Sequence, residues 1–271
     1  MKRILPCLLL TSAICFNIAT LAYGQEEPKA LHFFNFGGGY THPVSYDASY
    51  STIVYRGMAA TAVAQYHRRK PSFLDHLDFR FDYGELSNET SFAVVAYYRG
   101  EGNYSYQKHL KNIWQERLEW YVGGSVNFLY TLFRYRDFNN NSFNNSAYSS
   151  LSPQTSLVYN FSLWDRDFRA QVSAYIPVLT FAMRPSYGSS NFFGFLDDER
   201  DDTFRQLLES GKVTTLNRFF RYSNTFSLEY KLKKNPNRLR LSYEWNYVRY
   251  NEPRLTQTAS HNITFATMFN L

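Results

Sequence analysis

Residues 238–250 read RLRLSYEWNYVRY, and the alternation within this stretch decides the fold. Apolar and aromatic side chains take every second position from Leu239 to Tyr247, and polar side chains take the positions between them, from Arg240 to Asn246. Successive side chains of a β-strand point to opposite faces of its sheet. The stretch therefore predicts a strand with one apolar face and one polar face.

The same period of two recurs along most of the chain, for example between Asp75 and Gly84 and between Asn217 and Leu232. Many of the alternating segments are far longer than the five or six residues usual in soluble sheets. A tilted strand needs only about 9–11 residues to cross a bilayer. We predict ten strands, near 31–42, 49–68, 74–85, 90–99, 116–136, 147–163, 168–183, 217–232, 238–250 and 259–271.

The connections between these strands fall into two kinds. Tight turns are predicted at Arg69–Pro71, Trp164–Asp167 and Lys233–Asn237, and longer connections lie near 137–146, 184–216 and 251–258. Short turns at one end and longer loops at the other are typical of outer-membrane barrels. Counted from a periplasmic N-terminus, the tight turns all fall on the periplasmic side. The exception is 100–115, which is long and predicts an extra hairpin in an alternative with twelve strands.

The N-terminal residues predict export. Lys2 and Arg3 precede a mostly apolar stretch, and Ala22 and Gly24 place small residues before Gln25, which is the pattern of a secretory signal. We expect a signal peptide over 1–24 and a mature barrel domain over 25–271. Both cysteines lie in the signal, so we expect neither disulfides nor thiolate metal sites in the mature chain.

The composition fits a barrel wall better than a soluble core. The chain has 23 tyrosines and 24 phenylalanines, yet its mean hydropathy is −0.43. Aromatic girdles outside and polar residues inside produce this combination in membrane barrels. Loss of the signal would lower the formal charge from +6 to +4. This mild excess without a basic run gives no support for a nucleic-acid partner.

Together, the signal, the aromatic strands, the asymmetric connections and the final strand resemble bacterial outer-membrane β-barrel proteins. The strands rich in asparagine, tyrosine and phenylalanine resemble those of Bacteroidota barrels, without matching a particular subfamily. The resemblance implies a closed antiparallel transmembrane barrel of about ten strands in the cell outer membrane, with lipid, the barrel assembly machinery and other envelope proteins as partners. Phe269 and Leu271 resemble the C-terminal signal read by that machinery, although the last residue is leucine where an aromatic residue is usual. The alternative is a secreted, soluble β-sandwich.

Polar faces of the predicted strands should line a narrow lumen, only somewhat wider than an eight-stranded barrel that side chains fill. Charges of both signs there would pair across the interior and stabilise the barrel. The alternative is a small-solute channel whose selectivity these side chains set. The predicted lumen polar network comprises Asp78, Arg80, Asp82, Arg169, Arg221, Glu229, Arg240 and Glu244.

Other motifs give weaker indications. Phe192, Phe193 and Phe195 lie in the long connection 184–216 and predict a surface for a partner, with a lid folded into the barrel mouth as the alternative. His42 and His261 should come close together near the loop ends of the first and last strands, but no nucleophile accompanies them. The run Gly37–Gly39 lies in a strand with no helix after it, so it predicts wall curvature rather than phosphate binding.

We expect no catalytic set, no cofactor and no metal site. Three functions follow in order of preference. The first is a non-catalytic accessory or scaffold subunit of an outer-membrane complex. The second is a narrow channel for small solutes, and the third is a hydrolase that acts at the barrel rim on lipid or peptide.

Overall fold

The structure is a computed structural model. It describes residues 30–49, 51–88, 93–114, 117–135, 143–184, 209–233 and 235–271. The predicted signal peptide and the predicted partner surface at Phe192, Phe193 and Phe195 lie outside the described residues.

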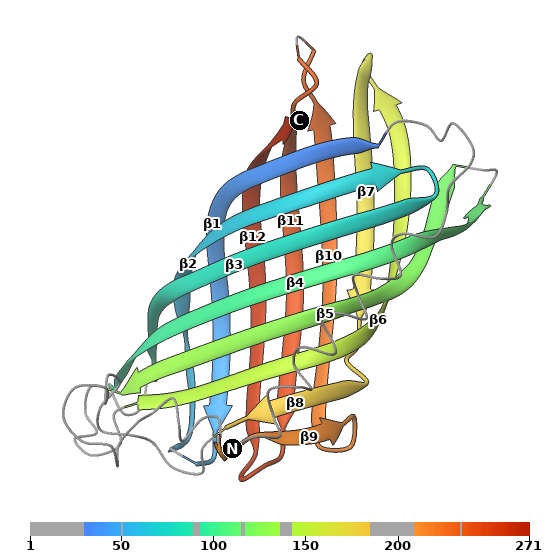
Figure 1. Ribbon diagram of the computed structural model, residues 1–271. Coiled ribbons are helices and arrows are strands. Elements are labelled where there is room, and N and C mark those ends of the chain that lie inside the picture. The colour runs from blue at the N-terminus through green and yellow to red at the C-terminus, as the bar shows by residue number, and fades with distance from the viewer. Residues whose placement is uncertain are drawn as a thin grey trace.

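Within the described part of the chain, ten antiparallel strands close into a barrel (Figure 1). Each strand pairs with the next around the wall, β7 pairs with β10, β12 pairs with β1, and the pairing of β5 with β6 completes the ring. The predicted ten-stranded closed barrel is confirmed. Its strands are β1 (Leu31–Asp47), β2 (Ser51–Lys70), β3 (Phe73–Ser87), β4 (Val94–Ile113), β5 (Leu118–Tyr135), β6 (Phe143–Leu163), β7 (Arg166–Tyr175), β10 (Phe219–Lys231), β11 (Arg238–Tyr250) and β12 (Thr256–Asn270).

Two short strands, β8 (Leu179–Met183) and β9 (Lys212–Thr215), add to this ring. The prediction of one strand over 168–183 was wrong, because β7 ends at Tyr175 and β8 begins only after residues 176–178. Pro177 lies in this break and has no backbone N–H to give to a ladder. β8 pairs with β6 and with β9, so the connection predicted over 184–216 contains a strand at its end.

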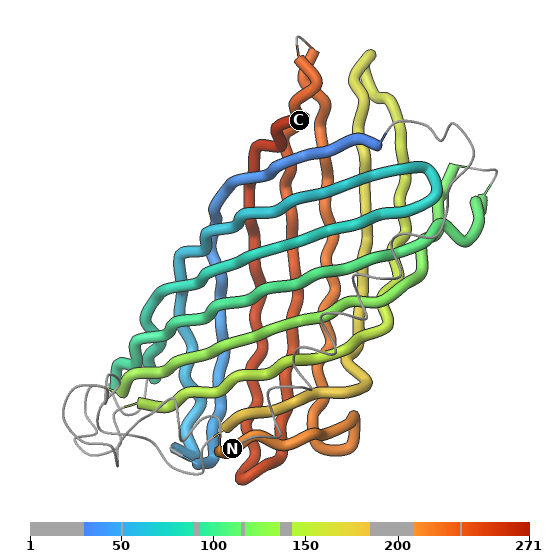
Figure 2. The backbone as a smooth tube through the Cα atoms, viewed as in Figure 1, coloured from blue at the N-terminus to red at the C-terminus, as the bar shows by residue number. Residues whose placement is uncertain are grey.

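The two ends of the barrel differ in their connections (Figure 2). We call the end that holds the three predicted tight turns and Leu271 the turn end, and the opposite end the loop end. The predicted extra hairpin at 100–115 was wrong, because β4 continues to Ile113 and turns at the turn end through Trp114, whose φ is 49°. Gly100 and Gly102 interrupt the aromatic pattern there, which hid the strand from the sequence analysis.

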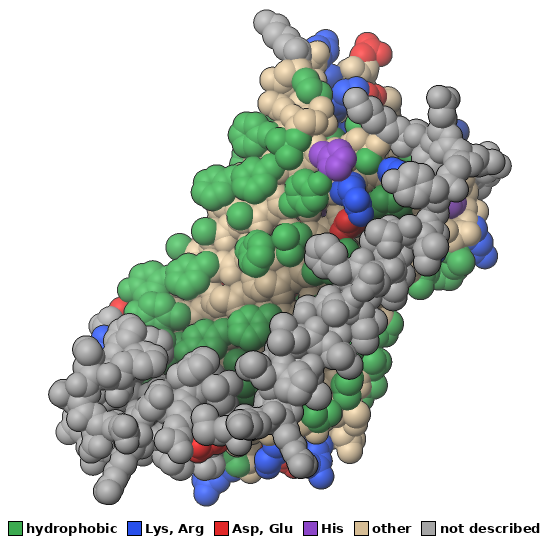
Figure 3. Space-filling view, viewed as in Figure 1, with side chains coloured by type: hydrophobic (Ala, Val, Ile, Leu, Met, Phe, Trp, Pro, Cys, Tyr) green, Lys and Arg blue, Asp and Glu red, His purple; other side chains and the backbone are tan. Residues whose placement is uncertain are grey.

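Alternation along the strands separates an apolar exterior from a polar interior. Aromatic side chains such as Phe36, Phe79 and Phe265 face outward and are 62%, 55% and 53% exposed. Figure 3 shows hydrophobic side chains spread over the visible wall, with charged side chains gathered toward the two ends. The interior-facing set on the same strands includes the buried Asp82, Arg221 and many serines, threonines and asparagines.

Glycines of β1 allow its backbone to approach β12 closely. A Cβ atom at Gly37 would lie 2.2 Å from the carbonyl oxygen of Phe265, and one at Gly39 would lie 1.9 Å from that of Ile263. Both oxygens belong to β12, the strand that closes the barrel against β1. β1 and β12 therefore approach too closely at these positions for a side chain, whereas the role of the run in wall curvature stays a prediction.

Apolar side chains fill the interior near both ends. At the loop end, Tyr55, Tyr97 and Phe133 belong to one buried cluster, and Tyr148 and Phe219 belong to another. At the turn end, a smaller cluster is formed by Leu74, Tyr121 and Val158. The polar part of the interior therefore lies between apolar packing at both ends.

Candidate functional site

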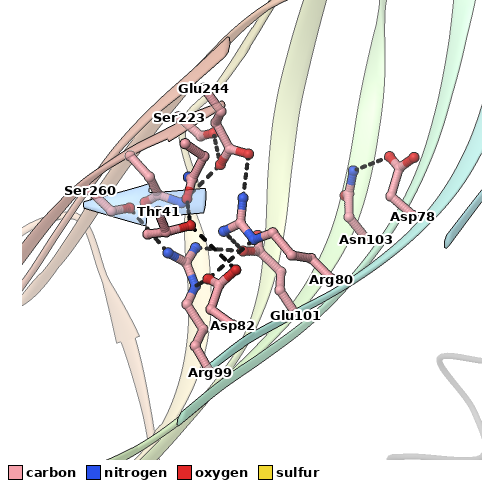
Figure 4. Close-up of polar contacts among 12 residues, drawn as sticks. Thr41, Asp78, Arg80, Asp82, Arg99, Glu101, Asn103, Ser223, Glu244 and Ser260 are labelled. Atoms are coloured by element: carbon pink, nitrogen blue, oxygen red, sulfur yellow. Dashed lines mark hydrogen bonds and ion pairs between the residues drawn. The ribbon is translucent and has the colours of Figure 1, made fainter. Parts of the chain in front are cut away.

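The most highly charged part of the interior surrounds Glu101 (Figure 4). Arg80 Nη2 and Arg99 Nη2 lie 2.7 and 2.5 Å from Glu101 Oε2, and Arg221 forms an ion pair with Oε1. These residues come from β3, β4 and β10, so the carboxylate of Glu101 joins strands on different sides of the barrel. We call the group of Arg80, Asp82, Arg99, Glu101, Arg221 and Glu244 the Glu101 layer.

Charges within the Glu101 layer balance, with three arginines and three carboxylates. Arg80 Nη1 lies 2.5 Å from Glu244 Oε2, and its Nε lies 3.5 Å from Asp82 Oδ2. Hydroxyl groups donate hydrogen bonds to other carboxylate oxygens of the layer. Ser223 Oγ donates to Glu244 Oε1 at 3.1 Å, and Thr61 Oγ1 donates to Asp82 Oδ1 at 2.8 Å. Buried charges need such pairing because an uncompensated charge in a low-dielectric interior is costly.

A second charged group lies nearer the turn end around Glu229. Arg69 contacts Glu229 with two parallel bonds of 2.7 and 2.5 Å, the geometry that gives guanidinium–carboxylate pairs their strength. Arg238 and Arg240 approach the same carboxylate to 3.5 and 4.0 Å. We call these four residues the Glu229 layer. Its three arginines share one carboxylate.

Two stacked histidines lie beside the Glu229 layer. The rings of His67 and His76 lie 4.3 Å apart, and both side chains are buried. Arg69 Nη2 and Arg240 Nη1 each lie 3.1 Å from His67 Nδ1. Nε2 of the same ring lies 3.2 Å from Arg240 Nη1 and 3.4 Å from both Asn35 Nδ2 and Asp78 Oδ1.

A cavity of about 120 Å³ lies between the two layers. Arg80, Glu101 and Glu244 bound it on one side and His67 and Arg240 on the other, and a wall of amide and hydroxyl side chains surrounds it. Among the described residues, no group of three or more His, Cys, Asp or Glu is placed to hold a metal ion. The chemistry of the cavity is therefore that of hydrogen bonding beside paired charges.

The distribution of apolar and charged side chains identifies the environment of the barrel. A closed ring leaves no unpaired strand edge, and its outward face is apolar and aromatic while its inward face carries the charges. The chain is an integral outer-membrane β-barrel. In the described residues, no helix is long and apolar enough to cross a membrane.

Comparisons with known proteins place this outer-membrane barrel among solved barrels without naming a subfamily. No family model matches the chain, and no curated protein matches it. The outer membrane protease OmpT from Escherichia coli has a TM-score of 0.45 at 10% identity, covering 93% of this chain and 99% of that one. The translocator domain of the autotransporter NalP from Neisseria meningitidis has a TM-score of 0.38 at 5% identity, covering 96% and 93%.

An outer membrane channel from Pseudomonas putida F1 has a TM-score of 0.34 at 9% identity, covering 92% of this chain and 100% of that chain. These similar proteins include a protease and a channel, so their activities differ from one another. At such identities and TM-scores the likeness transfers no activity to this barrel. Its function has to be argued from its own residues.

The barrel brings all eight residues of the predicted lumen polar network into the two layers, beside them or beside the cavity. Asp82 and Arg221 belong to the Glu101 layer, and Glu229 is the centre of the second layer. Asp78, Arg80, Arg240 and Glu244 line the cavity. Arg169 lies directly opposite Glu229 in the pairing of β7 with β10, and its Nη1 donates to Asn160 Oδ1 at 3.4 Å.

Sequence analysis missed several central residues of the interior. Arg99 and Glu101 were assigned to a strand end and a connection, so their inward direction was not recognised. Arg69 was assigned to a turn, although β2 continues to Lys70. For Glu101 the missed signal was the alternation of Arg99, Glu101 and Asn103 with glycines between them, which continues the inward face of β4.

The remaining predicted sites lie on the outside of the barrel. His42 and His261 are directly opposite each other in the pairing of β1 with β12, as expected from closure, but both side chains face outward. His261 Nδ1 lies 2.7 Å from the hydroxyl of Tyr243. Phe269 also faces outward and is 44% exposed, and the backbone N–H of Leu271 donates to the carbonyl of His32 at 2.9 Å.

Proposed function

We propose that this outer-membrane barrel is a non-catalytic accessory or scaffold subunit of an outer-membrane complex. The observation that carries the proposal is the filling of its interior. The Glu101 layer and the Glu229 layer join strands across the lumen, and apolar clusters pack beyond them at both ends. Such an interior makes the barrel rigid and leaves little room for solutes to pass. A rigid barrel suits a subunit that presents binding surfaces to other proteins.

Strand lengths support a role at the membrane surface. β2, β4 and β6 contain 20, 20 and 21 residues, whereas β10 and β11 contain 13 each. About 9–11 residues are enough to cross the bilayer. One side of the wall is therefore long enough to extend beyond the membrane, and such an extension can contact neighbouring proteins.

Copurification tests the proposal. A tagged barrel extracted gently from its native membranes should recover the same companion proteins in constant ratio. Alanine at Phe192, Phe193 and Phe195 should release them if the predicted partner surface is correct, whereas Gln107→Leu, a change inside the barrel, should not. Recovery of the unaltered barrel alone would count against the accessory role.

A narrow channel for small solutes is the second candidate, and the polar cavity of about 120 Å³ favours it. The cavity provides a place where a hydrated solute could pause between the two charged layers. Purified barrel in planar bilayers should then show small, discrete conductance steps. A silent bilayer would remove this candidate and leave the scaffold proposal standing.

The proposal of a non-catalytic role also has its own test. His42 and His261 face outward, and His261 is occupied by Tyr243. If a hydrolase acting on lipid or peptide were present at this position, alanine at either histidine would abolish an activity shown by the unaltered barrel. We expect no such activity to be found.

A further inference from the structure

The cavity between the two layers contains hydrogen-bond acceptors that the protein leaves open. Oxygen atoms of Asp78, Asn103, Gln154 and Gln171 are buried there without a hydrogen-bond donor from the described residues. Gln154 and Gln171 are only 7% and 3% exposed. Leaving a buried acceptor unsatisfied costs about 1–3 kcal/mol, so these oxygens require a partner inside the cavity.

The orientation of two of these amides is fixed by their nitrogen atoms. Gln171 Nε2 donates to Ser173 Oγ at 2.9 Å, and Asn103 Nδ2 donates to Asp78 Oδ2 at 3.4 Å. The oxygen of each amide must then point away from that contact. Asn262, which also lines the cavity, has an unpartnered Nδ2 donor, so the lining offers an occupant both open acceptors and an open donor.

Except for Asp78, which keeps one carboxylate oxygen open, the charges around the cavity are already paired within the described part of the barrel. Arg80 is paired with Glu101 and Glu244, and Arg240 contacts His67 and Ser227. An ammonium group in the cavity would face these guanidinium groups, and an anion would face three carboxylates. Entry of either charge without a new partner would be costly. A neutral occupant avoids both penalties.

Size and wall chemistry narrow the class of occupant further. A water needs roughly 10–15 Å³ of such volume, so the cavity has room for roughly eight to twelve waters, about the number of non-hydrogen atoms in a hexose. Ten of the twenty described residues that line it are serine, threonine, asparagine or glutamine. Hydroxyl side chains can donate or accept, so they match the hydroxyls of a sugar in either role.

We propose that this cavity is a binding site for one neutral polyol of monosaccharide size, whose hydroxyls donate to Asp78, Asn103, Gln154 and Gln171. Polyol binding would be a function additional to the scaffold role. The proposal does not depend on whether the lumen conducts solutes. Gln154 and Gln171 on one part of the wall and Asp78 and Asn103 on another contact the polyol from different strands.

Three sugars of matched size test the proposal on the purified, folded full-length barrel. D-glucose is neutral, glucosamine carries a positive charge and glucuronate carries a negative charge. After long equilibration, calorimetry or dialysis should detect one site for glucose, with each charged analogue at least about tenfold weaker. Equal or tighter binding of either charged sugar would overturn the proposal, and so would the absence of any binding, which would leave a cavity that holds water alone.

Variants separate the site from general effects on the barrel. Gln154→Leu and Gln171→Leu should each weaken glucose binding about three- to tenfold, the effect of losing one hydrogen bond. Gln107→Leu is the matched control, because Gln107 is also a buried inward glutamine with unpartnered side-chain atoms but does not line the cavity. The folded fraction of each variant is checked by its far-ultraviolet circular dichroism. Equal weakening of glucose binding by Gln107→Leu would contradict the assignment of the site. None of the three substitutions should change the copurification of partners or the conductance, so a failure of the binding site can be told apart from a failure of the proposed function.

Discussion

Arg69 and Glu229 are separated by 160 residues in sequence and form a two-bond ion pair across the interior of the barrel, at 2.7 and 2.5 Å. Their strands are not neighbours, because β1, β12 and β11 lie between β2 and β10 in the wall. The pair therefore joins parts of the wall that no backbone ladder connects. Arg238 and Arg240 lie beside the same carboxylate, so Glu229 also holds three like charges together.

Glu229→Gln should destabilise the barrel strongly. The substitution keeps the size of the side chain but leaves the buried Arg69 and Arg240 and the partly exposed Arg238 without their shared carboxylate, a change that typically costs about 3–5 kcal/mol. Urea unfolding of the refolded barrel, followed by tryptophan fluorescence, measures the loss. Glu252→Gln is the control, because its partners Lys212 and Arg218 are 61% and 57% exposed and such surface pairs contribute about 0–1 kcal/mol. A similar small effect at both positions would show that the Glu229 layer does not stabilise the barrel.

Gly39→Ala should impair closure of the barrel. The new Cβ would lie 1.9 Å from the carbonyl oxygen of Ile263, so β1 and β12 would have to separate. Overpacking of this kind costs about 1–3 kcal/mol or more. Gly100→Ala introduces the same methyl group on β4 with no atom within 4 Å, and it should fold as well as the unaltered barrel. Folding yield in detergent measures both, and equal yields would contradict the close approach of β1 to β12.

The sequence was sufficient to predict the number of strands in the ring and the faces of most residues, but not the ends of β4 and β7 or the short strands β8 and β9. Alternation alone placed Arg240 and Glu244 inward on β11, because the period of a strand assigns every residue to one face once a single residue is assigned. The same rule failed for Glu101 because the glycines beside it carry no side chain to mark the outward face. Arg69 was missed for a different reason, because the predicted strand ended at residue 68, inside a run of basic residues that continues to Lys70 before Pro71.

Which inward residues meet could not be predicted from the sequence. Local pairing fixes neighbours such as His42 and His261, but contact across the lumen depends on strand tilt, strand stagger and side-chain length together. Arg221 and Glu101 meet across the interior from β10 and β4, which a list of polar residues does not reveal. The cavity likewise depends on the space that these contacts leave.

Phe133→Ala should reveal the contribution of the apolar cluster at the loop end. Phe133 is 7% exposed and packs inside the barrel with Tyr97, so its removal leaves a void that should cost about 3–5 kcal/mol. Phe128 on the same strand faces outward and is 47% exposed, and lipid can fill the space left by its truncation. Phe128→Ala should therefore cost clearly less in the same urea titration. The reverse order would mean that the loop-end interior is loosely packed.

Phe269→Ala should reduce insertion into the outer membrane in cells more than it reduces the stability of the folded barrel. Phe269 faces outward near the turn end, and the pairing of β12 with β1 includes its contact with Phe34 in register. If the last strand is read by the assembly machinery before folding, the side chain matters most at that stage. Phe265 faces outward on the same strand and is 53% exposed, compared with 44% for Phe269. Quantitative fractionation of cells should therefore show a larger loss for Phe269→Ala than for Phe265→Ala, while urea titration of the two purified variants gives similar midpoints. Equal losses of inserted barrel for the two variants would show that Phe269 acts only as a lipid-facing aromatic residue. The assembly machinery would then recognise β12 through other residues.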